Sequence, residues 1–165
     1  MKAALDVHYE SSRSIAACVV FNNWLDIEPV DLIRVIVPSA SQYCAGRFYE
    51  RELPCLISVL QQADCEFDTI IIDGYVHLRA DVGKGLGVHL FESLSYASVV
   101  MGVAKNPLKV ADHYVPINRW RSKRPLFVSA IGCSIEQAAE SILSMHGPYR
   151  IPTLLKLADH YARTV

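Results

Sequence analysis

Apolar residues in the first part of the chain gather in short runs rich in β-branched and small side chains. Residues 2–9 (KAALDVHY) and 13–22 (RSIAACVVFN) form two such runs, and the polar residues between them predict a hairpin turn. A third run, 30–37, stops at Pro38. Because the three runs follow one another with short connections, we expect an antiparallel meander.

The spacing of apolar residues then becomes helical. A helix is predicted from Pro54 to Ala63, since proline suits the first turn of a helix. The run 67–72 (FDTIII) is short and β-branched, which is typical of a strand buried within a parallel sheet. Ser134 followed by Gln137 matches the capping box that begins a helix. The remaining predicted elements are helices at 86–96, 134–145 and 153–163 and strands at 98–104 and 125–130.

The order of these elements, βββαβαβ(β)αα, predicts an α/β fold. Strands that alternate with helices form sheets whose faces are covered by those helices. We expect a mixed sheet, with three antiparallel N-terminal strands followed by parallel strands, flanked by helices. The chain has 165 residues, and at about 150 residues per domain it is expected to form a single domain, 1–165.

Composition narrows the classes of function. Hydrophobic residues make up 52% and charged residues 20%, which fits a folded protein and argues against disorder. The net charge of −1 excludes a globally basic nucleic-acid-binding surface but leaves room for a local basic patch. The five cysteines are odd in number and no pair has CxxC spacing, so neither a disulfide framework nor a zinc knuckle is expected.

The same residues indicate a compartment. The cysteines are expected to be mostly buried thiols in a reducing environment. Asp6 and Glu10 lie where a secretory signal would need an apolar run. No apolar run approaches the roughly 20 residues that span a bilayer, so no membrane partner is expected. We therefore expect a cytoplasmic protein.

Three acidic residues lie inside or at the ends of predicted elements. Asp6 lies in the first strand, where a charge is costly unless it is paired or bound to a metal. Asp73 ends the run 67–72, and Glu52 precedes the helix predicted from Pro54. Each has an ordinary alternative: a solvent-facing strand residue, an Asp-Gly turn, and an acid favoured by the helix dipole.

Taken together, the three acids indicate a metal site. If the first strand and the first parallel strand are neighbours, these acids converge at one edge of the sheet. Converging carboxylates repel one another unless a hard divalent cation such as Mg²⁺ holds them. Such a site hydrolyses phosphodiesters, because the metal polarises the phosphate and lowers the pKa of an attacking water.

Six segments, in order, resemble the motifs of one family. They are DVHY at 6–9, YCAG at 43–46 with RELP at 51–54, IDG at 72–74, GLGVHL at 85–90, GVAK at 102–105 and YRIP at 149–152. In the endonuclease V family the counterparts are DVxY, a tyrosine-to-REXP segment, VDG, GLASHLG, GVAK and YRLP. The resemblance covers nearly the whole chain, with REXP and GVAK intact.

This resemblance implies an RNase H-like fold and an enzyme of DNA or RNA repair. It implies hydrolysis of the phosphodiester 3′ to a deaminated base, usually inosine, with Mg²⁺ or Mn²⁺ as the cofactor. It assigns Asp6, Glu52 and Asp73 to the metal and to catalysis. Lys105 would be a further catalytic residue, near the scissile phosphate; its alternative is a solvated strand end.

The resemblance also implies contacts to nucleic acid. Tyr43 and Gly46 correspond to the wedge loop that separates the strands at the lesion. His77 and His89 correspond to two family histidines, although the spacing around His77 differs from that of the family. The alternative for His89 is a helix histidine packed against its neighbours.

A basic segment provides a further candidate surface for nucleic acid. Arg119, Trp120, Arg121, Lys123 and Arg124 follow one another closely, with one aromatic residue among four cations. Such a segment can hold phosphates and stack on an unpaired base. The alternative is an ordinary solvated loop.

Departures from the family pattern leave a second hypothesis open. Residues 129–133 correspond to the family's SPGHR loop but contain no histidine, and Ala45 replaces a proline of the wedge. The chain could therefore be a divergent nucleic-acid-binding module with weakened or lost catalysis. The retained acids favour the enzyme, because buried carboxylates are costly once their metal is lost. No Gly-rich phosphate loop supports a third class, a small-molecule α/β enzyme.

Overall fold

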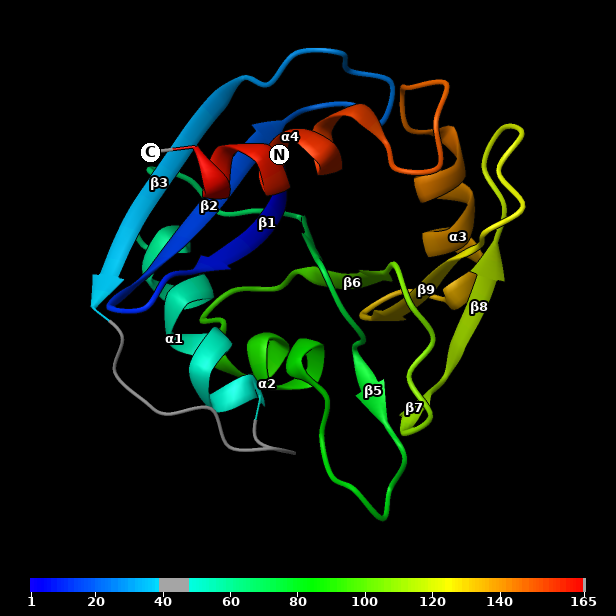
Figure 1. The fold of residues 1–165 in the computed structure, drawn as a ribbon, viewed down its shortest axis with the longest axis horizontal. Coiled ribbons are helices and arrows are strands. Elements are labelled where there is room, and N and C mark those ends of the chain that lie inside the picture. The colour runs from blue at the N-terminus through cyan, green and yellow to red at the C-terminus, as the bar shows by residue number, and fades with distance from the viewer. Residues whose placement is uncertain (39–47, 165) are drawn as a thin grey trace.

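The computed structural model describes residues 1–38 and 48–164. Within these residues, seven strands form one mixed sheet in the spatial order β3-β2-β1-β4-β6-β9-β8 (Figure 1). In chain order the strands are β1 (Lys2–Tyr9), β2 (Arg13–Phe21), β3 (Asp31–Pro38), β4 (Thr69–Ile72), β6 (Val99–Ala104), β8 (Tyr114–Ile117) and β9 (Leu126–Ile131). Two short strands, β5 (His77–Leu78) and β7 (Ala111–Asp112), pair with each other outside this sheet.

The strand directions explain how the sheet is assembled. β1, β2 and β3 form the predicted antiparallel meander. β4 pairs in parallel with both β1 and β6, so β1 and β4 are neighbours at the centre of the sheet, which is the condition for the acids to converge. β9 runs antiparallel to β6 and pairs with β8 in a hairpin, so the parallel part of the sheet ends at β6.

Helices cover both faces of the sheet (Figure 1). Alternate residues of a strand point to opposite faces, and the two faces carry separate cores. One core joins β1, β2 and β4 to α1 (Phe48–Leu60) and α2 (Leu86–Ser93). The other joins the opposite face to α3 (Ile135–Ser144) and α4 (Thr153–Arg163). The architecture is therefore the predicted α/β fold with a mixed sheet flanked by helices.

Helix α1 begins earlier than its sequence pattern predicts. It starts at Phe48, and Pro54 lies inside it rather than in its first turn. An internal proline removes one backbone hydrogen bond. Pro54 is exposed, whereas Glu52, Cys55 and Leu56 are buried on the side that packs against the sheet. Burial of this face offsets the local cost of the proline.

The C-terminal helices match the sequence prediction closely. α4 has the predicted bounds. α3 begins with the predicted capping box, in which the Ser134 side chain accepts from the Gln137 backbone and the Gln137 side chain accepts from that of Ser134. None of the helices in residues 1–38 and 48–164 is long and apolar enough to cross a membrane.

Candidate active site

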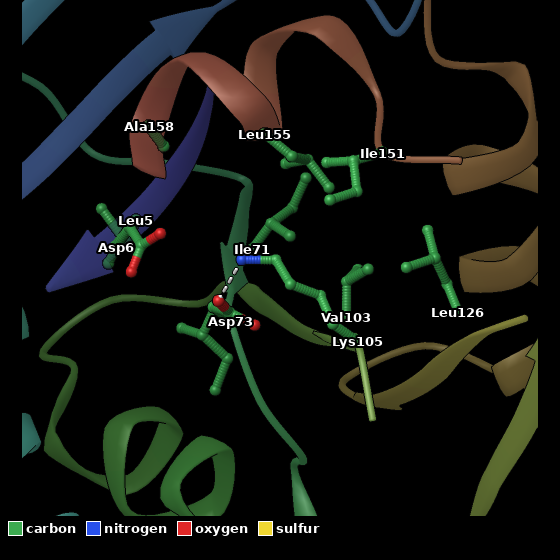
Figure 2. A pocket seen from close by; sticks show the side chains of 11 residues that line it. Leu5, Asp6, Ile71, Asp73, Val103, Lys105, Leu126, Ile151, Leu155 and Ala158 are labelled. Atoms are coloured by element: carbon green, nitrogen blue, oxygen red, sulfur yellow. Dashed lines mark hydrogen bonds and ion pairs between the residues drawn. The ribbon is translucent and has the colours of Figure 1, made fainter. Parts of the chain in front are cut away.

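Asp6 and Asp73 lie on neighbouring strands where β4 ends. β1 and β4 are parallel, and Leu5 is the register partner of Ile72, so an aspartate follows at the same level on each strand. Neighbouring strands are separated by about 4.8 Å. Both aspartates line a small cavity of about 20 Å³ between the sheet and α4 (Figure 2). The sheet topology therefore brings together the two acids that the sequence places at separate positions.

Lys105 joins these acids from the next strand. It follows β6, and its Nζ donates to Oδ2 of Asp73 at 2.6 Å, as the dashed line in Figure 2 shows. The side chains of both residues are about one-third exposed. Burial alone would lower the pKa of Lys105, but the hydrogen bond to Asp73 and the charges of Asp73, Asp6 and Asp159 together raise that pKa above its usual value. Lys105 therefore stays protonated and offsets the charge of Asp73.

Asp6 carries a charge that is offset less well. Its Oδ1 accepts a hydrogen bond from the backbone N–H of Val7 at 2.7 Å. Burial and the nearby charge of Asp73 raise the pKa of Asp6 to about 7, although the positive charge of Lys105 acts in the opposite direction. Ionised Asp6 is therefore unfavourable in this site unless a further cation is present.

Glu52 approaches the same acids from α1. It is 5% exposed, and its Oε2 is buried without a hydrogen-bond partner. Burial and the charges of Asp6 and Asp73 raise the pKa of Glu52 to about 8. Nearby, the guanidinium of Arg51 lies 3.8 Å from the ring centroid of Tyr9, a residue whose own pKa is raised by burial and by the charge of Glu52.

Asp159 is a fourth acid at this site, and the sequence analysis missed it. It lies on α4, and its charge acts on both Asp6 and Lys105. Burial alone would raise the pKa of Asp159, but Arg163, which donates to Oδ1 at 3.0 Å, and Lys105 lower it. The sequence feature that could have indicated it is its place in the predicted last helix, directly after the buried residue Ala158.

The four acids fit a hard divalent cation by their chemistry, although they do not form a closed cluster. In the described part of the chain, no three His, Cys, Asp or Glu side chains are arranged to hold a metal ion. The site nevertheless offers carboxylate oxygens alone, the donors that Mg²⁺ and Mn²⁺ prefer. A buried carboxylate oxygen without a partner and two raised pKa values are both features that a bound cation would relieve.

A wider pocket of about 400 Å³ also has Asp73 in its wall. Most of its lining is apolar and comes from the start of α1, the segment after β4 and the segment before β7; it includes Phe48, Tyr49, Leu78, Leu86, Leu108 and Val110. His89 stacks on Tyr49, with the two ring centroids 3.9 Å apart. His89 therefore supports the pocket wall from α2.

His77 lies apart from both of these pockets. Its Nε2 donates to the backbone carbonyl of Ala130 at 3.1 Å, and its ring packs edge-on against His113. These contacts attach β5 to β9. The predicted contact of His77 with nucleic acid stays a prediction, as does that of His89.

The basic loop, residues 118–125, connects β8 to β9 beside Lys105. Ala104 is the register partner of Phe127, so the loop ends where β6 ends. Arg150 reinforces this placement, because its Nη2 donates to the carbonyls of both Lys105 and Pro125. The loop therefore lies at the same edge of the sheet as the acids.

Arg119 is the one buried residue among the five candidates of the basic segment. It is 2% exposed, and its guanidinium donates to the carbonyls of Met145 and, at 2.7 Å, of Tyr149. The predicted contact of Arg119 with a nucleic-acid backbone is therefore not supported, because its donors already fix the α3–α4 connection. Trp120 is 69% exposed, and Arg121, Lys123 and Arg124 are exposed as well. Their side chains are therefore accessible to nucleic acid, as the predicted contact requires. Tyr43 and Gly46, the predicted wedge residues, lie outside the described residues.

The seven-stranded mixed sheet with helices on both faces is an RNase H-like fold. The family model for endonuclease V matches residues 1–119. The chain belongs to the endonuclease V family, a family of nucleases. No curated protein sequence matches the chain.

Solved structures agree on the fold. Endonuclease V from Ciona intestinalis, in complex with a 23-mer DNA that contains an inosine, superposes with a TM-score of 0.81 at 20% identity, covering 98% of this chain and 83% of that one. The catalytic domain of human endonuclease V gives 0.80 at 24% identity, with coverage of 98% and 80%. The Streptomyces avermitilis enzyme gives 0.78 at 23%, with coverage of 98% and 78%.

Proposed function

We propose that this protein is a metal-dependent endonuclease that hydrolyses the phosphodiester 3′ to a deaminated base, inosine, in DNA or RNA. The observation that carries the proposal is the juxtaposition of Asp6 and Asp73 on the two central strands, with buried Glu52 and the Lys105 ammonium beside them. Membership of a nuclease family supports the reaction class. The inosine in the DNA bound by the Ciona relative supports the substrate.

Each residue has a definite part in this proposal. Asp6, Glu52 and Asp73, joined by Asp159, would hold Mg²⁺ or Mn²⁺. A cation bound there polarises the phosphate and lowers the pKa of an attacking water. Lys105 holds an ammonium group at the edge of the acids, where it offsets the charge of Asp73 and attracts a phosphate oxygen.

The wider pocket supports recognition of a single unstacked base. Enzymes that act at a particular base in a duplex usually extrude it into a pocket, where it stacks against apolar side chains. The 400 Å³ pocket has apolar walls and includes Asp73, so a base held there would bring its own strand to the acids. The same pocket would accept a base from either DNA or RNA.

The basic loop supports contact with the strand beyond the lesion. Arg121, Lys123 and Arg124 are exposed cations beside Lys105, and Trp120 presents an exposed ring. Cations of this kind hold phosphates without reading sequence, and an exposed ring can stack on an unpaired base.

One assay tests this function. End-labelled DNA and RNA strands that contain one inosine, and matched strands with guanine at that position, are incubated with the protein and Mg²⁺ or Mn²⁺, and the products are mapped. We expect a single cut on the 3′ side of the inosine, no cut in the guanine strands, and no cut in EDTA. Cleavage without regard to inosine, or undiminished cleavage in EDTA, would contradict the proposal.

A second candidate is a nucleic-acid-binding module without catalysis. It is favoured by the lack, among the described residues, of three side chains arranged to hold a metal ion. The segment 129–133, which contains no histidine, points the same way. Tight binding of inosine strands with no cleavage in either metal would select this candidate over the enzyme.

A further inference from the structure

Two side chains from distant parts of the chain hold the main chain at Lys105. The hydroxyl of Tyr75 donates to the carbonyl of Asn106 at 2.8 Å. The guanidinium of Arg150 donates to the carbonyl of Lys105 itself and, at 2.8 Å, to that of Pro125. The peptide groups on both sides of Asn106 are therefore fixed by side chains.

Tyr75 is itself immobilised by packing. It is buried, and its ring lies against Tyr114 and Phe127, with ring centroids 5.3 Å and 6.4 Å apart. It also follows Asp73 by two residues, so its hydrogen bond joins the segment after β4 to the segment after β6. These two segments carry the two partners of the Asp73–Lys105 ion pair.

Arg150 makes a corresponding connection on the other side. It lies just before α4, which carries Asp159, and it binds carbonyls at the end of β6 and at the end of the basic loop. One guanidinium thus links Lys105 to the loop proposed to hold the strand. Arg119 differs, because its carbonyl partners all lie in the α3–α4 connection.

The ion pair alone is a weak means of fixing Lys105. Both partners are about one-third exposed, and pairs of such exposure contribute little because water screens them. The side chain of lysine is long and flexible, so the reach of its ammonium is decided by where its Cα is held. An ordered lysine at this place therefore needs anchors on its main chain.

We propose that Tyr75 and Arg150 are positioning residues that fix the main chain at Lys105, so that its ammonium reaches Asp73 in the free protein and the substrate phosphate in the complex. That the Lys105 ammonium reaches a substrate phosphate rests on the proposed function. That the two anchors hold Lys105 against Asp73 concerns the free protein alone and can be tested without cleavage.

The first test measures how fast Lys105 reacts with an amine-selective acylating reagent, followed by peptide mass spectrometry, with exposed Lys109 as the internal reference. Loss of one anchoring hydrogen bond in Tyr75→Phe should speed acylation of Lys105 about fivefold. Arg150→Gln should have an effect at least as large, and Arg150→Lys, which keeps one donor group, should fall between it and the parent. Rates at Lys105 equal to the parent's in both Tyr75→Phe and Arg150→Gln would overturn the proposal.

Matched controls separate positioning from general loss of stability. Tyr114→Phe removes a hydroxyl from the same aromatic cluster that bonds to neither Lys105 nor Asn106, and Val59→Ala removes buried volume from the core under α1, away from Lys105. Both controls should leave acylation of Lys105 unchanged, even where the melting temperature falls. If they speed it as much as Tyr75→Phe does, the effect is one of stability and the proposal is overturned.

The second test measures cleavage of an inosine strand. Tyr75→Phe should lower kcat about fivefold with KM unchanged, because the strand still binds while Lys105 is less well placed. Arg150→Gln should lower kcat and raise KM, because it also releases the basic loop. If KM alone changes in Tyr75→Phe, its positioning part is refuted. If the parent fails to cleave while the acylation results hold, the proposed function fails and the anchoring of Lys105 stands.

Discussion

Asp6 and Glu52 are held in surroundings that oppose their ionisation. Burial and neighbouring carboxylates raise the pKa of Asp6 to about 7 and that of Glu52 to about 8. In both residues the pKa in the folded protein exceeds the ordinary value, which is 3.8 for Asp6 and 4.5 for Glu52. The contribution of the protonated carboxyl to the stability of the folded protein is therefore complete below the ordinary pKa. It is lost as the pH rises through the folded-state values.

This loss of stability with rising pH gives a prediction for the metal-free protein. Its melting temperature in EDTA should fall as the pH rises from about 5 to about 8. Asp6→Asn should flatten that dependence, because it removes one of the two titrating groups. Added Mg²⁺ should raise the melting temperature more at the upper pH, where the carboxylates are ionised. A melting temperature in EDTA that is constant over this range would contradict the coupling.

The ligand assignment can be tested at Asp73. Asp73→Asn keeps the size of the side chain but removes a negative charge, so the fold should survive while cleavage is lost. We expect a loss of more than the roughly 10–100-fold that changes outside the ligand set produce. Asp68→Asn, at the opposite end of β4, is the matched control and should cleave normally. Unchanged turnover of Asp73→Asn at saturating Mg²⁺ would refute the assignment.

Apart from Glu52, which lies in the RELP segment, the parts of the site that sequence could predict are those tied to strands. Asp6, Asp73 and Lys105 follow or lie in clear strands, and parallel strands bring their ends to one edge. Asp159 could not be found this way, because the direction in which a helix residue points depends on how the helix lies on the sheet. The burial of Arg119 was hidden as well, because its carbonyl partners are supplied by a connection distant in sequence.

At the scale of elements, strong periodicity predicted well and short or interrupted patterns did not. β1 and α4 have the bounds that their patterns indicate. β8 is short and contains Pro116, which weakens its strand pattern. The start of α1 was misplaced because Pro54 imitates a helix start, whereas packing of the buried face carries the helix through it.

The basic loop is the element whose part in binding can be measured most directly. Replacing Arg121 and Lys123 together by glutamine should weaken binding about equally for inosine and ordinary strands, since phosphate contacts carry no sequence information. The dependence of binding on salt should become shallower by roughly one unit of slope for each cation removed from a phosphate. Lys2→Gln, at the opposite edge of the sheet, should change neither. Binding equal to the parent's at every salt concentration would show that the loop is only solvated.

At the scale of the whole molecule, Arg119 attaches the hairpin β8–β9 to the α3–α4 connection. Arg119→Met should lower the free energy of unfolding by about 3 kcal/mol, because buried carbonyls lose a charged donor. Urea unfolding measures this loss. The salt dependence of nucleic-acid binding should stay that of the parent, since the side chain is buried. A shallower salt slope without loss of stability would restore Arg119 to the binding surface.

Asp6 and Asp159 stand near opposite ends of the sequence yet influence each other's ionisation, because α4 packs across β1. The set of four acids is therefore complete only when α4 is docked on β1.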